Sequence, residues 1–171
     1  MTTTAGAPGA DGEAAVRELR ELAHGWIDGQ YGDPARLVEA AARAVAAGVD
    51  TPALPLLAGL LRAELDQVPE LFRQVMDELG FGFHPPEDYW QGRLALARWY
   101  AAEVVGGWLD PWDGAELVIE NVAEAYGASE ELAPVVDAVR ALQDPGGPDY
   151  PSDVSAHLTR AARELLARIP A

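Results

Sequence analysis

The residues best suited to acid–base chemistry lie in one short segment near the middle of the chain. His84 is followed by Pro85 and Pro86 and then by two carboxylates, Glu87 and Asp88. An imidazole titrates near neutral pH and carboxylates tune it, so this segment could hold a general acid or base on a rigid loop. In the alternative, structural interpretation, Glu87 or Asp88 caps the following helix, and His84 hydrogen-bonds locally or lies exposed. The positions suit a cap, and we favour that interpretation.

A second pairing of carboxylate and imidazole joins Glu21 and His24 at the Glu-x-x-His spacing, which places both side chains on one helix face. Di-iron helical bundles need this motif twice, together with two further helix-borne glutamates. Here Val154 stands three positions before His157, no second copy exists, and the chain has no cysteine. We therefore expect no metal site and no cofactor.

Motifs for nucleophilic or nucleotide chemistry are missing from the sequence. The three serines, Ser129, Ser152 and Ser155, lie in no Gly-x-Ser-x-Gly elbow. The chain also contains no P-loop and no dinucleotide-binding fingerprint. We identify no catalytic residues, and the sequence favours a protein that is not an enzyme without deciding the matter.

Aromatic residues are concentrated between positions 81 and 112, where eight of the thirteen lie. Three of them, Trp99, Trp108 and Trp112, could be core residues that close a helical hairpin. They could also form a patch that binds a partner protein, or the floor of a pocket for an apolar ligand. We favour the core and keep the other two interpretations open. The candidate binding surface is therefore Trp99, Trp108 and Trp112 together with His84 and Glu87.

The segment from 87 to about 106 must position these residues, and its pattern predicts one long helix. Trp90, Leu94, Ala97 and Ala101 recur at the spacing that lines a single helix face. Other apolar residues lie on the remaining sides, and the polar residues form no continuous stripe. A helix that is apolar nearly all round belongs inside a bundle. We expect this helix to be central, with Trp90 buried.

Helical periodicity also recurs along the rest of the chain from residue 13 onward, apart from the Pro-bearing segment 81–86 and the loop at 143–151. Asp-Pro pairs at 33–34 and 110–111 are typical helix starts, and Gly48 and Gly80 are typical helix ends. No segment shows the alternation of a β-strand. We predict an all-α fold of about eight helices, a single-domain bundle at 13–171 with helical subregions at about 13–80 and 86–169. Residues 1–12 are small and Pro/Gly-bearing, and we expect a disordered tail there.

The composition limits the classes of partner. The chain has 28 acidic and 12 basic residues, a formal net charge of −16, and all of its basic residues are arginine. Nucleic acids require a cationic surface, and no apolar run approaches the ~18 residues of a membrane span. The first ten residues lack the basic start and apolar core of a secretion signal. We expect a cytoplasmic protein that binds neither nucleic acid nor a membrane.

Together these observations predict a non-enzymatic, acidic α-helical module that binds another protein. It would be an adaptor, or an immunity-type protein that neutralises a basic partner. Two alternatives stay open. One is a helical-bundle enzyme or small-ligand-binding protein with a site near His84 and the Trp99, Trp108 and Trp112 cluster. The other is a structural subunit of a larger assembly.

Overall fold

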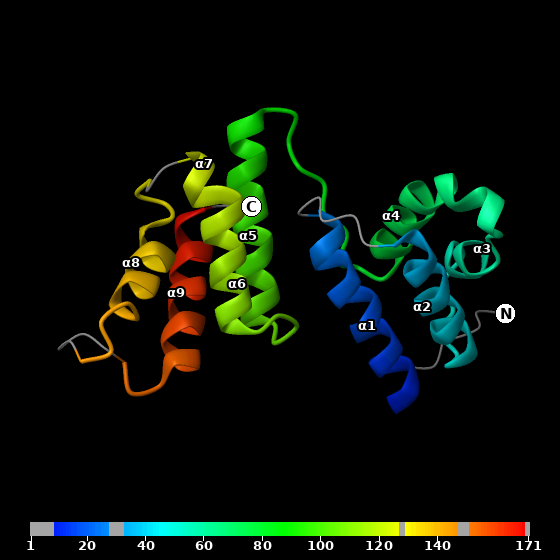
Figure 1. Ribbon diagram of the computed structural model, residues 1–171, viewed down its shortest axis with the longest axis horizontal. Helices are drawn as coiled ribbons and strands as arrows, with labels where there is room; N and C mark the ends of the chain where they lie inside the picture. The colour runs from blue at the N-terminus through cyan, green and yellow to red at the C-terminus, as the bar shows by residue number, and fades with distance from the viewer. Residues whose placement is uncertain (1–8, 28–32, 127–128, 147–150, 170–171) are drawn as a thin grey trace, which may run out of the picture. The chain divides into compact units, whose positions relative to one another are not determined.

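The computed structural model describes residues 9–27, 33–126, 129–146 and 151–169, and all regular structure in these ranges is helical (Figure 1). This confirms the predicted all-α class. Within the same ranges there are nine α-helical segments, and two of them, α6 and α7, are joined by a π-helical turn into one rod. The number of separate helices therefore agrees with the predicted number of about eight.

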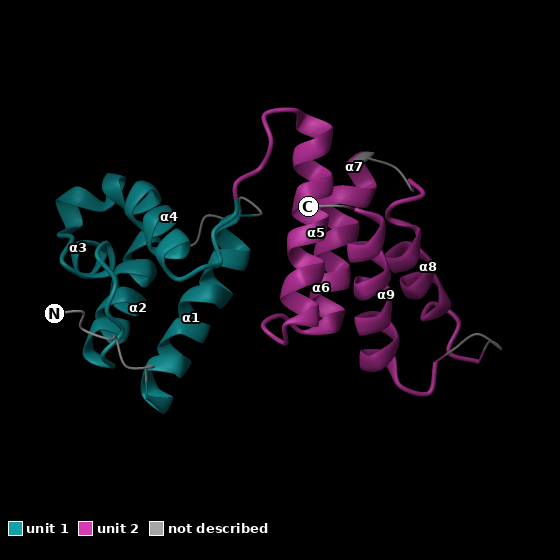
Figure 2. Ribbon diagram, turned by 180° about the vertical axis from the view of Figure 1, so that it is seen from behind, with its two compact units in different colours: residues 1–83 teal, residues 84–171 magenta. Residues whose placement is uncertain are grey.

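The chain divides into two compact units, residues 1–83 and 84–171 (Figure 2). The division falls between the two helical subregions that the sequence predicts. That the units act as one domain around residues 87–106 stays a prediction. Unit 1 contains α1 (Ala10–Ile27), α2 (Pro34–Ala46), α3 (Leu54–Ala58), a 3-10 helix (Arg62–Gln67) and α4 (Val68–Glu78). Unit 2 contains α5 (Tyr89–Val105), α6 (Pro111–Val118), the π turn (Ile119–Ala123), α7 (Glu124–Tyr126), α8 (Ala133–Ala141) and α9 (Val154–Arg168).

Helix ends in both units follow local sequence signals. Four aspartates accept a hydrogen bond from a backbone N–H of the helix that follows and so satisfy a donor that the helix leaves free: Asp33, Asp88, Asp110 and Asp153. Gly48 and Gly80 end α2 and α4 with φ angles of 82° and 79°, which only glycine adopts readily. The predicted starts at Asp33 and Asp110 and the ends at Gly48 and Gly80 are confirmed.

The core of unit 1 lies between α1, α2, α3 and α4. Leu19, Leu57 and Phe72 are fully buried there, and Trp26 packs edge-on against Phe72 with ring centroids 5.9 Å apart. α3 has no side-chain cap of its own. Instead Glu78, at the end of α4, accepts a hydrogen bond of 2.9 Å from the backbone N–H of Ala53.

In unit 2, α5 packs against α6 and α9, and α8 packs against α9. Val118, Val122, Leu132 and Leu165 are fully buried. α5 and α6 approach each other closely at Gly114, where a Cβ atom would lie 2.2 Å from Cγ2 of Val104. A side chain at position 114 would therefore require Val104 or one of the two helices to move.

Two expectations from the sequence are wrong. The disordered tail at 1–12 is too long, because α1 begins at Ala10 and buries Gly12. The first turn of α1 consists mostly of small residues, which give no apolar periodicity from which a helix could be predicted. Residues 1–8 lie outside the described ranges. Trp90 is 47% exposed rather than buried, because the first turn of α5 extends beyond the neighbouring ends of α7 and α9 (Figures 1 and 2).

No helix among the described residues is long and apolar enough to cross a bilayer.

Candidate functional site

His84 and Glu87, the two polar members of the predicted surface, precede α5 and are both exposed. Asp88 caps the helix by accepting from the N–H of Gln91 at 2.9 Å. This is the capping role that the sequence offered to Glu87 or Asp88. A catalytic role for His84 stays only the alternative that the sequence left open.

The three tryptophans lie further along the chain. Trp99 is half-buried on α5, with its ring edge-on to Tyr100 at 5.5 Å. Trp108, also half-buried, follows the end of α5, and a Cβ atom on Gly106 would lie 2.8 Å from its indole ring. Trp112 is in the first turn of α6 and is 42% exposed. The exposure of Trp112 fits a surface role better than a core role.

The predicted residues do not converge on one place within unit 2. α5 is 17 residues long, so its two ends lie about 25 Å apart at about 1.5 Å per residue. Glu87 lies just before the first end, whereas Trp108 and Trp112 lie beyond the second. Glu87 and the two tryptophans therefore do not line a single pocket.

An unpredicted feature surrounds Trp112. Along α6, the π turn and α7, Trp112 is followed at intervals of four residues by three glutamates, and Asp113 lies beside them. Residues four apart share a helix face. All of these side chains are exposed. We call this surface the acidic ridge, and it consists of Trp112, Asp113, Glu116, Glu120 and Glu124.

The π turn at Ile119–Ala123 lies beneath the ridge. A π turn widens a helix and interrupts its regular hydrogen bonding. Such turns are rare overall, but those that occur are often found at functional sites. Here the backbone carbonyl of Asn121 accepts a partly buried hydrogen bond of 2.9 Å from the guanidinium of Arg93 on α5. This hydrogen bond connects the rod to α5 at the π turn, where the α-helical hydrogen-bonding pattern is interrupted.

The acidic ridge has no counter-charge of its own. Among the described residues, none of its four carboxylates forms an ion pair, and no basic residue occurs between Arg98 and Arg140. Several arginines of unit 2 instead satisfy backbone carbonyls: Arg93 with Asn121 (2.9 Å), Arg98 with Ile169 (3.1 Å) and Arg168 with Glu130 (2.6 Å). The arginines hold the unit together, and the carboxylates of the ridge face solvent.

The Glu-x-x-His pair of α1 has a different environment. His24 is buried and Glu21 is exposed. Within the described part of the chain, no group of three histidine, aspartate or glutamate side chains is placed to hold a metal ion. Glu21 and His24 therefore have no third ligand placed beside them among the described residues.

Comparison with known proteins adds no family: no family model, no curated protein and no solved structure matches the chain.

Proposed function

We propose that the chain is a non-enzymatic protein-binding module whose acidic ridge receives a basic segment of a partner protein. The observation that carries the proposal is the ridge itself, in which an exposed tryptophan continues into a row of unpaired carboxylates. The proposal covers an adaptor and an immunity-type protein alike. It places the protein in the cytoplasm and includes neither nucleic acid nor a membrane as partner, because anionic phosphates would be repelled.

The ridge has two chemical elements that complement a basic helix. Its carboxylates attract arginine or lysine side chains over a distance and orient the encounter. Trp112 offers an aromatic face for a cation and an apolar anchor that loses its water on binding. From Trp112 to Glu124 the ridge extends about 18 Å at ~1.5 Å per residue, so arginines at four-residue spacing on a partner helix would match its glutamates.

The proposal is tested with a synthetic helical peptide that carries three arginines at four-residue spacing. Its affinity is measured by fluorescence anisotropy for the natural chain and for the ridge variant, Glu116→Gln, Glu120→Gln and Glu124→Gln combined. We expect the ridge variant to bind about tenfold more weakly, since each exposed ion pair contributes about 0.2–1 kcal/mol.

A matched control separates the ridge from overall charge. The control variant combines Glu13→Gln, Glu21→Gln and Asp66→Asn, three exposed acidic residues of unit 1. It loses as much negative charge as the ridge variant and should keep nearly the natural affinity. Equal affinities of the two variants would show that net charge, and not the ridge, attracts the peptide.

A further inference from the structure

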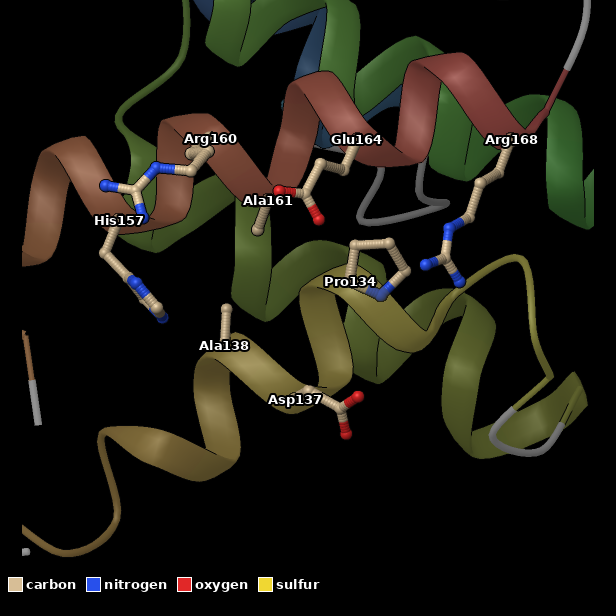
Figure 3. Close-up of a pocket in the computed structure, with 8 residues that line it drawn as sticks. All are labelled: Pro134, Asp137, Ala138, His157, Arg160, Ala161, Glu164 and Arg168. Carbon is tan, nitrogen blue, oxygen red and sulfur yellow. The ribbon is translucent and has the colours of Figure 1, made fainter. Parts of the chain in front are cut away.

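A groove lies between α8 and α9 in unit 2, away from every residue that the sequence singled out as a binding surface. It has a volume of about 260 Å³. Its lining combines an apolar floor of Pro134, Ala138 and Ala161, all buried, with charged and polar side chains from both helices (Figure 3). A small concave site with an apolar floor and a few polar groups is the usual form of a ligand pocket.

His157 supplies the first polar group. Its Nε2 atom is buried, yet it has no hydrogen-bond partner among the described residues. Buried polar atoms almost always have a partner, and a buried atom without one calls for a specific explanation. The imidazole extends from α9 toward the side of the groove formed by α8 (Figure 3). Because Nε2 itself has almost no exposed surface, a ligand in the groove would supply the missing partner once the imidazole turns to bring Nε2 to the groove.

Arg160 and Glu164 supply the second and third groups. They are one helical turn apart on α9 and carry opposite charges, a spacing at which such side chains commonly pair. No ion pair or hydrogen bond joins them, and neither has another such partner within the described ranges. In Figure 3 the guanidinium of Arg160 lies at the His157 end of the groove, and the carboxylate of Glu164 lies beside Ala161.

The other charged residues of the groove are already engaged. Asp137 accepts a 2.6 Å bond from Arg140, and Arg168 donates a 2.6 Å bond to the backbone carbonyl of Glu130. Only His157, Arg160 and Glu164 therefore have their full capacity left for a ligand. These three provide a site for an anion beside a site for a cation.

We propose that this groove binds a small zwitterion, a free α-amino acid with a short apolar side chain. Its carboxylate would take a two-pronged interaction with the guanidinium of Arg160 and a bond from Nε2 of His157. Its ammonium group would donate to the carboxylate of Glu164, and its side chain would lie on the alanine and proline floor. The groove is on α8 and α9, whereas the acidic ridge is on α6 and α7, so this inference does not depend on the proposed function.

The test uses L-alanine as the probe, with binding followed by nuclear magnetic resonance of the backbone amides and of the His157 ring. We expect saturable shifts confined to α8 and α9, and a shift of the ring signals of His157. Acetate and methylamine, which carry one half of the zwitterion each, should bind much more weakly. Binding of acetate as strong as that of L-alanine would overturn the zwitterion and leave only a carboxylate site.

Single substitutions then assign the two charges. Arg160→Gln and Glu164→Gln should each weaken binding about tenfold or more, the loss expected for one charge-assisted interaction. Arg163→Gln is the matched control, because Arg163 is an exposed arginine of the same helix that does not line the groove. It should leave affinity unchanged. The proposal is overturned if L-alanine gives no saturable shift, or if Arg163→Gln weakens binding as much as Arg160→Gln.

Discussion

Trp112 distinguishes the acidic ridge from an ordinary solvated helix face. An exposed row of glutamates needs no partner to be stable in water. A large aromatic ring exposed at the end of that row leaves apolar surface in solvent, and tryptophan is enriched at the energetic centres of protein interfaces. Trp112 combines with the glutamates to suit a partner that presents both a cation and an apolar contact.

Replacing Trp112 should therefore separate binding from stability. In Trp112→Ala we expect the free energy of unfolding to change by less than about 0.5 kcal/mol, as for other exposed positions. Affinity for the arginine peptide should fall several-fold. Leu56→Ala is the control, since Leu56 is a 60% exposed apolar residue of unit 1 and is not part of the ridge. Denaturant unfolding measures the change in stability, and fluorescence anisotropy measures the change in peptide affinity. A large loss of stability in Trp112→Ala would show that Trp112 is a core residue.

Glu78 is a residue whose role depends on a distant partner. Its Oε2 accepts the N–H of Ala53 and so caps α3. Glu78→Ala should lower the free energy of unfolding by about 1 kcal/mol, the usual effect of losing a cap. Glu78→Gln keeps an oxygen acceptor and should lose much less. Equal losses in thermal or denaturant unfolding would mean that the hydrogen bond is not what Glu78 contributes.

At the scale of the elements, the close approach of α5 and α6 gives the sharpest prediction. Gly114→Ala places a Cβ atom against Cγ2 of Val104, a stiff and buried side chain. Alanine normally stabilises a helix relative to glycine, but overpacking here should destabilise unit 2 by about 1–3 kcal/mol. The measurement is denaturant unfolding.

Two further variants check that cause. In Gly146→Ala the added Cβ would meet only an ordinary contact, Oδ1 of Asp144 at 3.9 Å, so stability should stay nearly unchanged. Combining Gly114→Ala with Val104→Ala removes the clash, so the pair should cost less than the sum of the single changes. Strict additivity would contradict the packing explanation.

A pair of charges joins α1 to α2 and makes that contact sensitive to acid. Both guanidinium nitrogens Nε and Nη2 of Arg43 donate to Glu18, at 3.1 and 2.5 Å. The hydrogen bond from Arg43 lowers the pKa of the Glu18 carboxyl below its ordinary value. The stabilisation is therefore complete above the unfolded-state pKa of glutamate and is lost as pH falls through the lower folded-state pKa.

Glu18→Gln should consequently reduce stability slightly at neutral pH and not at all at strongly acidic pH. The effect is small because both side chains are partly exposed. The free energies of unfolding of the two chains, measured across the acidic range, should converge as the pH falls. A constant difference at every pH would contradict a contribution from the ionised pair.

Local signals explain how much of the elements could be predicted. Asp33 and Asp110 cap helices that start one residue later, and Gly48 ends one by its own backbone angle, so each signal lies within its own segment. The cap on α3 could not be predicted, because Glu78 lies 25 residues from Ala53. The exposure of Trp90 likewise depends on where neighbouring helices end.

The candidate site was predictable in part. The four-residue spacing from Trp112 to Glu124 is visible in the sequence, as is the lack of arginine between positions 98 and 140. Either pattern indicates that Trp112 lies on the protein surface. The groove beside His157 was not predictable, because it requires knowing that α8 lies against that face of α9.

At the scale of the whole molecule, the charge of −16 is divided between two units that are both acidic. Long-range attraction of a basic partner thus comes from the entire chain. The acidic ridge determines the position at which the partner binds. Salt weakens the first effect strongly, because the distance over which charges act falls from about 30 Å at ~0.01 M to about 8 Å at ~0.15 M salt.

The most direct test of an electrostatic binding surface is the association rate of the arginine peptide at these two ionic strengths. For the natural chain we predict a fall of about tenfold or more on adding salt. The ridge variant should associate more slowly at low salt than the control variant, although both carry the same net charge. An association rate that is the same at both ionic strengths, or the same in both variants, would contradict the proposal that the acidic ridge receives a basic partner.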